Sequence, residues 1–360
     1  MLAKNVLTFR SALVLSLLWL LSGCRPYYTQ EDFAKVKKID THVHLNSASN
    51  AMGKLAEEDN FRLVTVNVDA PRMSLHQQMS YALQQKANFP KDISFLASFS
   101  IPEGQPAGWQ DLVIKQLDSA FNNGALGIKV WKNIGMVYRD TANRFIMIDD
   151  PMFDPIIKFV IGRDKMVLGH IGEPKNCWLP LDQMTVNNDR TYFERHPEYH
   201  MFRHPEYPSY EDQINARDRF LEKHPDLRFV GAHLGSLEWS VDELARRLDK
   251  FPKMAVDMAA RIGHFQVQSQ HDREKVRNFI IKYADRLIYA TDGGLSPDVD
   301  PDKSKQGQHD AWVRDWTYFA TSEMLTVPEV NGSFKGLQLP KDVINKIYYE
   351  NALKWFGIEN

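Results

Sequence analysis

Short apolar runs that alternate with amphipathic segments constrain the fold of this chain more than any other feature. Eight runs have the length of buried strands: Val36–His44, Phe61–Val68, Ile93–Ser100, Ala125–Trp131, Met166–His170, Leu227–His233, Met254–Met258 and Leu287–Thr291. Helical periodicity is found between runs in five segments: Asp111–Asn122, Asp154–Gly162, Ile214–His224, Val241–Phe251 and Asp272–Ala284. This alternation predicts a (β/α)8 barrel of the TIM type. An open doubly wound sheet is the alternative, and the lack of a GxGxxG turn after the first run disfavours it.

One long connection interrupts the alternation. Pro174 to Tyr210 is rich in Pro, Tyr, His and Asn, and it holds the near-duplicate stretches Arg195–Tyr199 and Arg203–Tyr207. A structureless connection of this length in a compact domain is usually functional. Since it follows the fifth run, we expect residues 174–210 to cover the barrel mouth as a lid or substrate wall. The alternative is that this connection only extends into solvent. In either case we expect residues 36–360 to form a single domain.

Residues 1–23 have the pattern of a bacterial lipoprotein signal peptide. The uncharged stretch Ser11–Leu21 follows a short basic region and is shorter than the about 20 residues that span a bilayer. It ends in Leu21-Ser22-Gly23-Cys24, which resembles a lipobox, with lipid attached to Cys24; an ordinary secretory signal is the alternative. Residues 24–35 then read as a polar tether. We therefore expect an exported cell-envelope protein that meets the membrane only through its lipid anchor.

The composition of the chain limits the kinds of molecule that we expect it to bind. Hydrophobic residues make up 43% of the chain and charged residues 25%, which is ordinary for a globular protein with a large core. The formal net charge of −2 gives no indication of the excess positive charge with which proteins bind nucleic acid. Besides Cys24 the chain holds only Cys177, so the mature protein is expected to form no internal disulfide. A small molecule is the expected partner, and the oligomeric state is not indicated.

Polar residues with metal-binding side chains stand where the expected strands end. His42 and His44 lie two residues apart, so in a strand both side chains point to the same face. His170, His233 and Asp292 close the fifth, sixth and eighth runs. In a (β/α)8 barrel these ends meet at the face where active sites are built. Together they predict a site for Zn²⁺ or a similar divalent ion.

These segments resemble the amidohydrolase superfamily, in particular its amidohydrolase-related (amidohydrolase 2) branch of hydrolases and decarboxylases. The resemblance rests on Ile39–His44, Gly169-His170, Gly231–Gly235 and Tyr289–Asp292, with Asn351-Ala352 near the C-terminus, and it spans residues 36 to 357. It implies a distorted barrel with a catalytic divalent ion held by His42, His44, His170 and Asp292. One ion is favoured and two are the alternative. His233 would then act on substrate or water, or bind the second ion.

Lys129 bears on the number of ions. It lies in the fourth run, where two-metal relatives carry a carboxylated lysine that bridges both ions. In the one-metal branch a lysine here can instead bind a substrate carboxylate, which is the interpretation that we favour. A lysine whose amine reaches solvent is the structural alternative.

Further residues are candidates for substrate binding: Trp131, Glu173, Trp178, Arg261 and Tyr192. The guanidinium of Arg261 could bind a carboxylate or phosphate, or form an ion pair with Asp257 or another acid. Glu173 could orient a metal ligand or face solvent. The two tryptophans are equally compatible with core packing.

The resemblance implies that a metal-activated water attacks an ester, lactone or amide carbonyl. Asp292 would take the proton of that water, and His233 would polarise the carbonyl. A non-oxidative decarboxylase with the same metal site is the first alternative. A non-catalytic surface lipoprotein that binds a ligand is the second. The expected location favours hydrolysis of an external compound.

Overall fold

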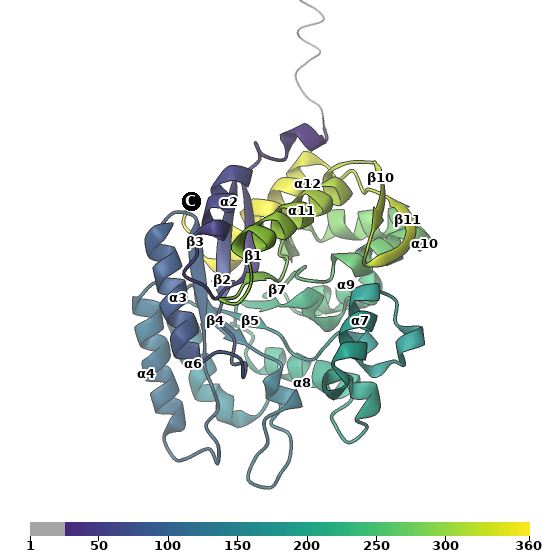
Figure 1. The fold of residues 1–360 in the computed structure, drawn as a ribbon. Helices are drawn as coiled ribbons and strands as arrows, with labels where there is room; N and C mark the ends of the chain where they lie inside the picture. Colours follow the sequence, from purple (N-terminus) through teal and green to yellow (C-terminus); the bar gives the residue numbers. More distant parts are fainter. Residues whose placement is uncertain (1–25) are drawn as a thin grey trace, which may run out of the picture.

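The computed structural model describes residues 26–360, and a parallel sheet forms its centre (Figure 1). Its strands follow the predicted runs: β1 (Lys38–Leu45), β2 (Phe61–Val66), β3 (Ile93–Ser98), β4 (Gly127–Val130), β5 (Met166–Gly169), β6 (Phe229–Gly231), β7 (Met254–Asp257) and β8 (Leu287–Ile288). Each strand pairs in parallel with the next in chain order from β1 to β8.

The chain after β8 closes the sheet onto its first strand. The backbone N–H of Thr41 donates to Tyr289 O at 3.3 Å, and that of Asp292 donates to His42 O at 2.9 Å. The next strand, β9 (Gly293–Leu295), then pairs in parallel with β1. The predicted (β/α)8 barrel is therefore confirmed.

Helices connect the strands on the outside of the barrel. The principal ones are α2 (Ala51–Asp59), α3 (Leu75–Asn88), α4 (Trp109–Asn122), α6 (Asp154–Gly162), α8 (Tyr210–Lys223), α9 (Val241–Lys250), α10 (Ile262–Lys282) and α11 (Pro301–Ala320). The sequence pattern located five of them, although α10 begins ten residues before the predicted segment and is kinked at Asp272. Ser209 and Asp212 form a reciprocal capping box that starts α8.

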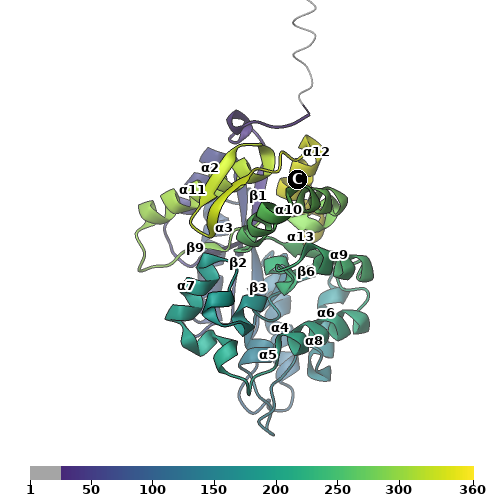
Figure 2. The same ribbon diagram turned by 90° about the vertical axis from the view of Figure 1, so that its right-hand side faces the viewer.

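Shorter elements complete the chain. They are α5 (Asn133–Met136), the 3-10 turns η1 (Gln30–Asp32), η2 (Pro151–Phe153), η7 (His233–Ser236) and η8 (Ala284–Arg286), the hairpin β10 (Met324–Val327) and β11 (Val330–Lys335), and the C-terminal α12 (Lys341–Asn345), η9 (Lys346–Glu350) and α13 (Asn351–Phe356). The hairpin, which the sequence pattern did not reveal, lies beside α10 (Figures 1 and 2).

A register shift in β1 determines which of its side chains enter the barrel. Ile39 belongs to an apolar cluster with inward residues of other strands, such as Val64, and with α13. Val43, four residues later, packs with the outer cluster beneath the helices, and the register of β1 against β2 shifts between Asp40 and Val43. A bulge changes the alternation of a strand. His42 and His44 therefore share the inner face, and Asp40 points outward to α11.

Residues 174–210 are structured, in contrast to the expected loop. They form η3 (Lys175–Trp178), η4 (Leu181–Gln183), α7 (Asn187–Arg195), η5 (Pro197–Tyr199) and η6 (Met201–Arg203). We call residues 174–210 the cover segment. Buried residues of the cover segment form a small apolar cluster with Met136: Cys177, Met184, Phe193 and Met201. The cover segment therefore has buried apolar side chains of its own, which a structureless surface loop of this length would lack.

The described part of the expected tether packs on the barrel. Phe33 is buried, Trp316 Nε1 donates to Thr29 O at 3.1 Å, and Tyr27 forms a bridge with Pro340. Residues 26–35 are thus bound to the domain. The predicted signal peptide and Cys24 lie outside the described residues. Among residues 26–360, no helix combines the length and the apolar character needed to cross a bilayer.

Candidate metal centre and pocket

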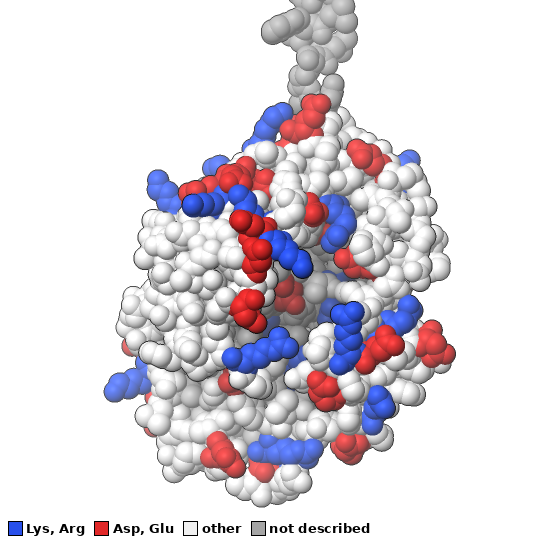
Figure 3. Space-filling model, viewed as in Figure 1, with Lys and Arg blue, Asp and Glu red and all other residues white. Residues whose placement is uncertain are grey.

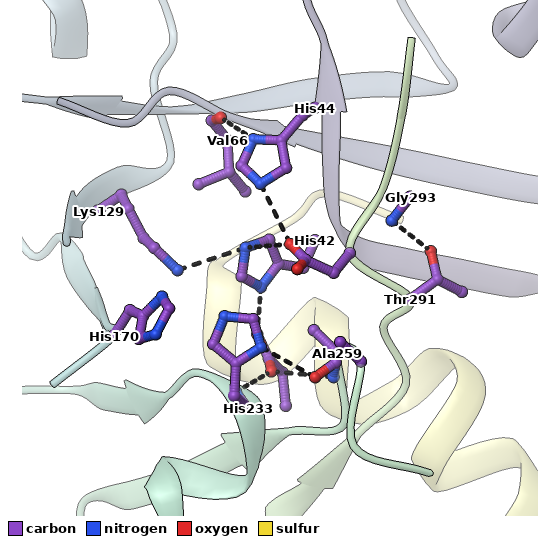
Figure 4. Close-up of polar contacts among 12 residues, drawn as sticks. His42, His44, Val66, Lys129, His170, His233, Ala259, Thr291 and Gly293 are labelled. Carbon is purple, nitrogen blue, oxygen red and sulfur yellow. Dashed lines mark hydrogen bonds and ion pairs between the residues drawn. The ribbon is translucent and has the colours of Figure 1, made fainter. Parts of the chain in front are cut away.

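The two histidines of β1 turn one nitrogen each toward a common point. His44 Nδ1 lies 2.9 Å from Val66 O, and His42 Nδ1 lies 2.9 Å from the Asp257 carboxylate (Figure 4). A carbonyl oxygen only accepts, so the neutral His44 ring carries its proton on Nδ1 and presents a lone pair at Nε2. His42 is held in the same way, and each neutral ring presents an Nε2 lone pair that can bind a cation.

Asp292 faces these two lone pairs. Its Oδ1 lies 3.2 Å from His44 Nε2 and 3.4 Å from His42 Nε2. One donor atom from each of the three residues lies within 4.8 Å of the others. Burial opposes ionisation of Asp292, but the imidazoles of His44, His42 and His233 beside it hold its pKa well below the ordinary value. The Nε2 lone pairs of the two histidines and the carboxylate of Asp292 together form a donor set that suits a divalent ion.

His170 and His233 extend the cluster from β5 and β6. Their rings lie 4.2 Å apart between centroids, and His233 lies 5.0 Å from His42. His233 Nδ1 is 2.9 Å from Ala259 O, which again leaves Nε2 with a lone pair in the neutral ring. Burial lowers the pKa of both rings well below the ordinary value, and the charge of Lys129 adds to this effect at His170. Neutral imidazoles are the form that binds metal.

His170 has an incomplete set of partners. Its buried Nε2 has no hydrogen-bond partner within the described part of the chain. The nearest acid is Glu173, whose Oε2 lies 3.4 Å away. Buried polar atoms are rarely left unsatisfied, and Glu173 is the group placed to pair with this nitrogen. The structure therefore brings together all five metal-site residues expected from the sequence.

Lys129 is the buried cation of this cluster. It points into the barrel from β4, and its Nζ lies 3.3 Å from His42 Nε2. Burial lowers the pKa of Lys129 to about 8, although Asp257 and Asp292 oppose this shift. The position of Lys129 suits either role considered for it, because its amine lies beside His42 and its side chain lines the pocket.

Asp257 is a site residue that sequence reasoning missed. It ends β7 fully buried, and its Oδ1 accepts from the backbone N–H of His233 at 2.7 Å and of Ala259 at 3.2 Å. Its other oxygen is the partner of His42. The ion pair considered for Arg261 forms with another acid, Asp189, at 3.7 Å and not with Asp257. An acid at the end of the seventh apolar run was the available signal.

Three residues that follow β6, β7 and β8 have a left-handed backbone conformation. The φ angles of His233, Ala260 and Asp292 are 59°, 54° and 67°. Such conformations cost a non-glycine residue roughly 1–3 kcal/mol and persist where the surrounding structure imposes them. Here the hydrogen bonds to Asp257 Oδ1 and to His42 O hold His233 and Asp292 in place.

A pocket of about 1030 Å³ opens above the cluster, and Figure 3 shows a hollow bordered by charges of both signs. Besides the metal-site residues and Lys129, its lining includes four of the substrate-binding candidates: Trp131, Glu173, Arg261 and Tyr192. Trp178 is not among them, because its indole packs in the cover segment and donates to Pro208 O at 3.3 Å. Additional lining residues that the sequence pattern did not indicate are Arg72, Lys132, Asp189 and Asp298.

Comparisons with known proteins match this architecture. The solved 2,6-dihydroxybenzoate decarboxylase from Rhizobium is similar, with a TM-score of 0.51 and 14% identity over 90% of this chain and 99% of that one. A dihydroorotase from Saccharomyces cerevisiae in complex with 5-fluoroorotic acid gives 0.50 and 11% over 90% and 85%. Likenesses this distant show the fold alone. No match was found among curated protein sequences. The sequence profile described as amidohydrolase matches residues 39–358, and the chain therefore belongs to the amidohydrolase family.

Proposed function

We propose that the protein is a metal-dependent hydrolase that cleaves an ester, lactone or amide bond of a small molecule. The observation that carries this proposal is the convergence of the His42 and His44 lone pairs with the Asp292 carboxylate at the pocket floor. Residues that would hold the ion are His42, His44 and Asp292, with His170 as the fourth. When bound, a divalent ion such as Zn²⁺ supplies a water with a pKa of about 7 and polarises a carbonyl.

Asp292 is the base in this scheme. Its carboxylate is ionised, faces the histidines, and is one-third exposed (33%) on the pocket side. It can therefore accept a proton from the attacking water and return it to the leaving group.

His233 is suited to accepting a proton rather than donating one. Its Nδ1–H is directed to Ala259 O, so the neutral ring has only a lone pair to offer at Nε2. We had expected His233 to polarise the carbonyl. The geometry instead favours a role in taking a proton from the substrate or in holding a second ion.

We propose that the substrate carries a carboxylate. Arg261 lines the pocket, is 92% buried, and has an Nε atom with no hydrogen-bond partner within residues 26–360. Lys129 adds a second buried cation beside His42. Buried cations that lack full pairing favour a charged ligand, because an anion would offset the cost of their desolvation.

The same two cations support a second candidate, non-oxidative decarboxylation. The carboxylate that they bind would then be the group released as CO2. The fold is shared with a solved 2,6-dihydroxybenzoate decarboxylase, which makes this reaction a reasonable alternative for the same metal site.

A substrate screen of the metal-loaded protein separates these reactions. Lactones, esters and amides with a free carboxylate would be tested beside aromatic carboxylic acids, with product acid and CO2 measured in parallel. Acid production without CO2 supports hydrolysis, and CO2 release supports the lyase. Tight binding of a carboxylate without turnover of any compound would favour a ligand-binding protein, and a chain that retains no divalent ion would contradict the metal centre.

We also propose that Cys24 carries a lipid that anchors the protein to a membrane of the cell envelope. The Leu21-Ser22-Gly23-Cys24 pattern supports this proposal. Radiolabelled palmitate should enter the wild-type protein and not Cys24→Ala. Equal labelling of both would remove the anchor.

A further inference from the structure

A buried ion pair lies between the cover segment and the proposed metal centre. Lys132, two residues after β4, pairs through Nζ with Glu173 Oε1. The other oxygen, Glu173 Oε2, lies 3.4 Å from His170 Nε2. The side chains of Lys132 and Glu173 are only 12% and 4% exposed. An ion pair in this setting costs desolvation energy and is weak evidence for stability, so its position needs another explanation.

Aromatic rings of the cover segment close over the ammonium of this pair. Lys132 Nζ lies 5.1 Å from the ring centroid of Tyr199 and 5.8 Å from that of Tyr192, with Trp131 at 5.6 Å. The two tyrosine rings stack at 6.3 Å with planes 12° apart. Cation–π contacts of this kind hold a desolvated ammonium in place. The seating of the cover segment thus shields the ion pair from solvent.

His170 differs from the other three histidines in what holds its ring. His42, His44 and His233 each direct Nδ1 to a carboxylate or carbonyl oxygen at 2.9 Å. His170 has no such bond to either ring nitrogen in the described part of the chain, and Glu173 is the acid beside it. Metal-binding histidines generally need a partner of this type to fix ring orientation.

We propose that Glu173 is the positioning residue for His170, with its carboxylate beside Nε2 so that Nδ1 is the nitrogen that would bind the ion, and that Lys132 and the cover segment hold Glu173 in place. Through this chain the cover segment would set the orientation of one metal ligand when it is seated over the pocket. The inference rests on the proposed metal centre and deepens it, because it couples pocket closure to the affinity for the ion.

The first test is the metal affinity of Glu173→Gln, which keeps the size of the side chain and removes its charge. We expect the dissociation constant for Co²⁺, measured by competition with a chromophoric chelator, to rise by about 10- to 100-fold. The visible absorption of the Co²⁺-loaded variant should also change, because it reports ligand geometry. A loss of stability alone would leave that spectrum unaltered. Glu206→Gln is the matched control, since Glu206 lies 3.5 Å from His204 but is 61% exposed on the surface.

The second test is a double-mutant cycle with Lys132→Met. If Lys132 acts through Glu173, Lys132→Met weakens Co²⁺ binding, and the double variant is no worse than Glu173→Gln alone. Additive losses, or an unchanged affinity and spectrum in Glu173→Gln, would overturn the inference while leaving the metal centre intact. Absence of Co²⁺ binding by the wild type would overturn both.

Discussion

Two clusters of buried polar side chains lie on opposite faces of β1. The first is the proposed metal centre with His42, His44, His170, His233 and Asp292, which lines the pocket. The second, which we call the acid–tyrosine cluster, consists of Asp40, Tyr289, Asp315 and Tyr348. The members of the second cluster are buried and titratable too, yet none of them lines the pocket of about 1030 Å³.

The clusters differ in which polar atoms are left without a hydrogen-bond donor and in where the lone pairs of these atoms point. Asp40 accepts from Thr291 Oγ1 at 2.6 Å and Trp312 Nε1 at 2.9 Å, so neighbouring side chains satisfy its oxygens. His42, His44 and His233 each direct Nδ1 to a protein oxygen at 2.9 Å, so each neutral ring presents its Nε2 lone pair to the site. Burial and a shifted pKa are therefore common to both clusters, and the direction of the free lone pairs is what separates a site from a structural network.

The largest effect is expected when the metal centre loses its first two ligands. His42→Ala combined with His44→Ala should remove the bound ion and lower activity by more than the about 100-fold that loss of an indirect partner can cost. Elemental analysis and turnover assays measure both. His196→Ala with His204→Ala, a pair at the rim of the cover segment, is the control. A double β1 variant that keeps ion and activity would sink the assignment.

The next effect concerns the pH dependence of stability and belongs to the acid–tyrosine cluster. Burial raises the pKa of Asp315 to about 7, against 3.8 for the unperturbed group. Between these values the folded state binds the extra proton, so the free energy of unfolding falls as the pH rises. Asp315→Asn removes this term. Relative to the wild type, the variant should gain about 2–3 kcal/mol between pH 5 and pH 8.

Urea unfolding at the two pH values measures this difference for Asp315→Asn. Asp310→Asn, on the same helix and on its solvent side, is the control and should show no such gain. If the free energy of unfolding had the same pH dependence in the wild type and in Asp315→Asn, the pKa of Asp315 would not be raised in the folded protein.

A smaller change in the metal centre should follow from Asp257→Asn. The neutral amide holds the His42 Nδ1–H less strongly than a carboxylate does, and it cannot accept equally from the backbone of His233. We expect the metal dissociation constant to rise about 10- to 100-fold. Chelator competition tests this, with the exposed Asp285→Asn as control. An unchanged affinity would leave His42 oriented by packing alone.

The smallest effect is expected for Tyr289→Phe. The Tyr289 hydroxyl donates to Asp315 Oδ2 at 2.8 Å, and its loss leaves a buried acceptor without a donor. The free energy of unfolding should fall by about 1–2 kcal/mol, while metal affinity stays at the wild-type value. If Tyr289→Phe weakened metal binding as much as Asp257→Asn, the two clusters could not be treated as separate.

Strand positions were readable from the sequence because each buried strand is a short apolar run between turns. The same reasoning placed His42 and His44 on one face, and both do line the pocket, because the register shift between Asp40 and Val43 leaves these two side chains on the same side. It could not place Asp40, which lies before the bulge and faces α11 instead of the barrel interior. A bulge leaves no clear trace in the apolar pattern, since it depends on pairing with β2.

The sequence by itself determined the barrel and the ring of metal-binding residues at its mouth, since parallel strands bring all their carboxyl ends to one face. Only the tertiary structure decided which acid serves which histidine. Asp257 reaches His42 across 215 positions of the chain, and Lys132 meets Glu173 beneath the cover segment. These pairings depend on distances between side chains from separate strands and loops, and no local pattern of residues encodes such distances.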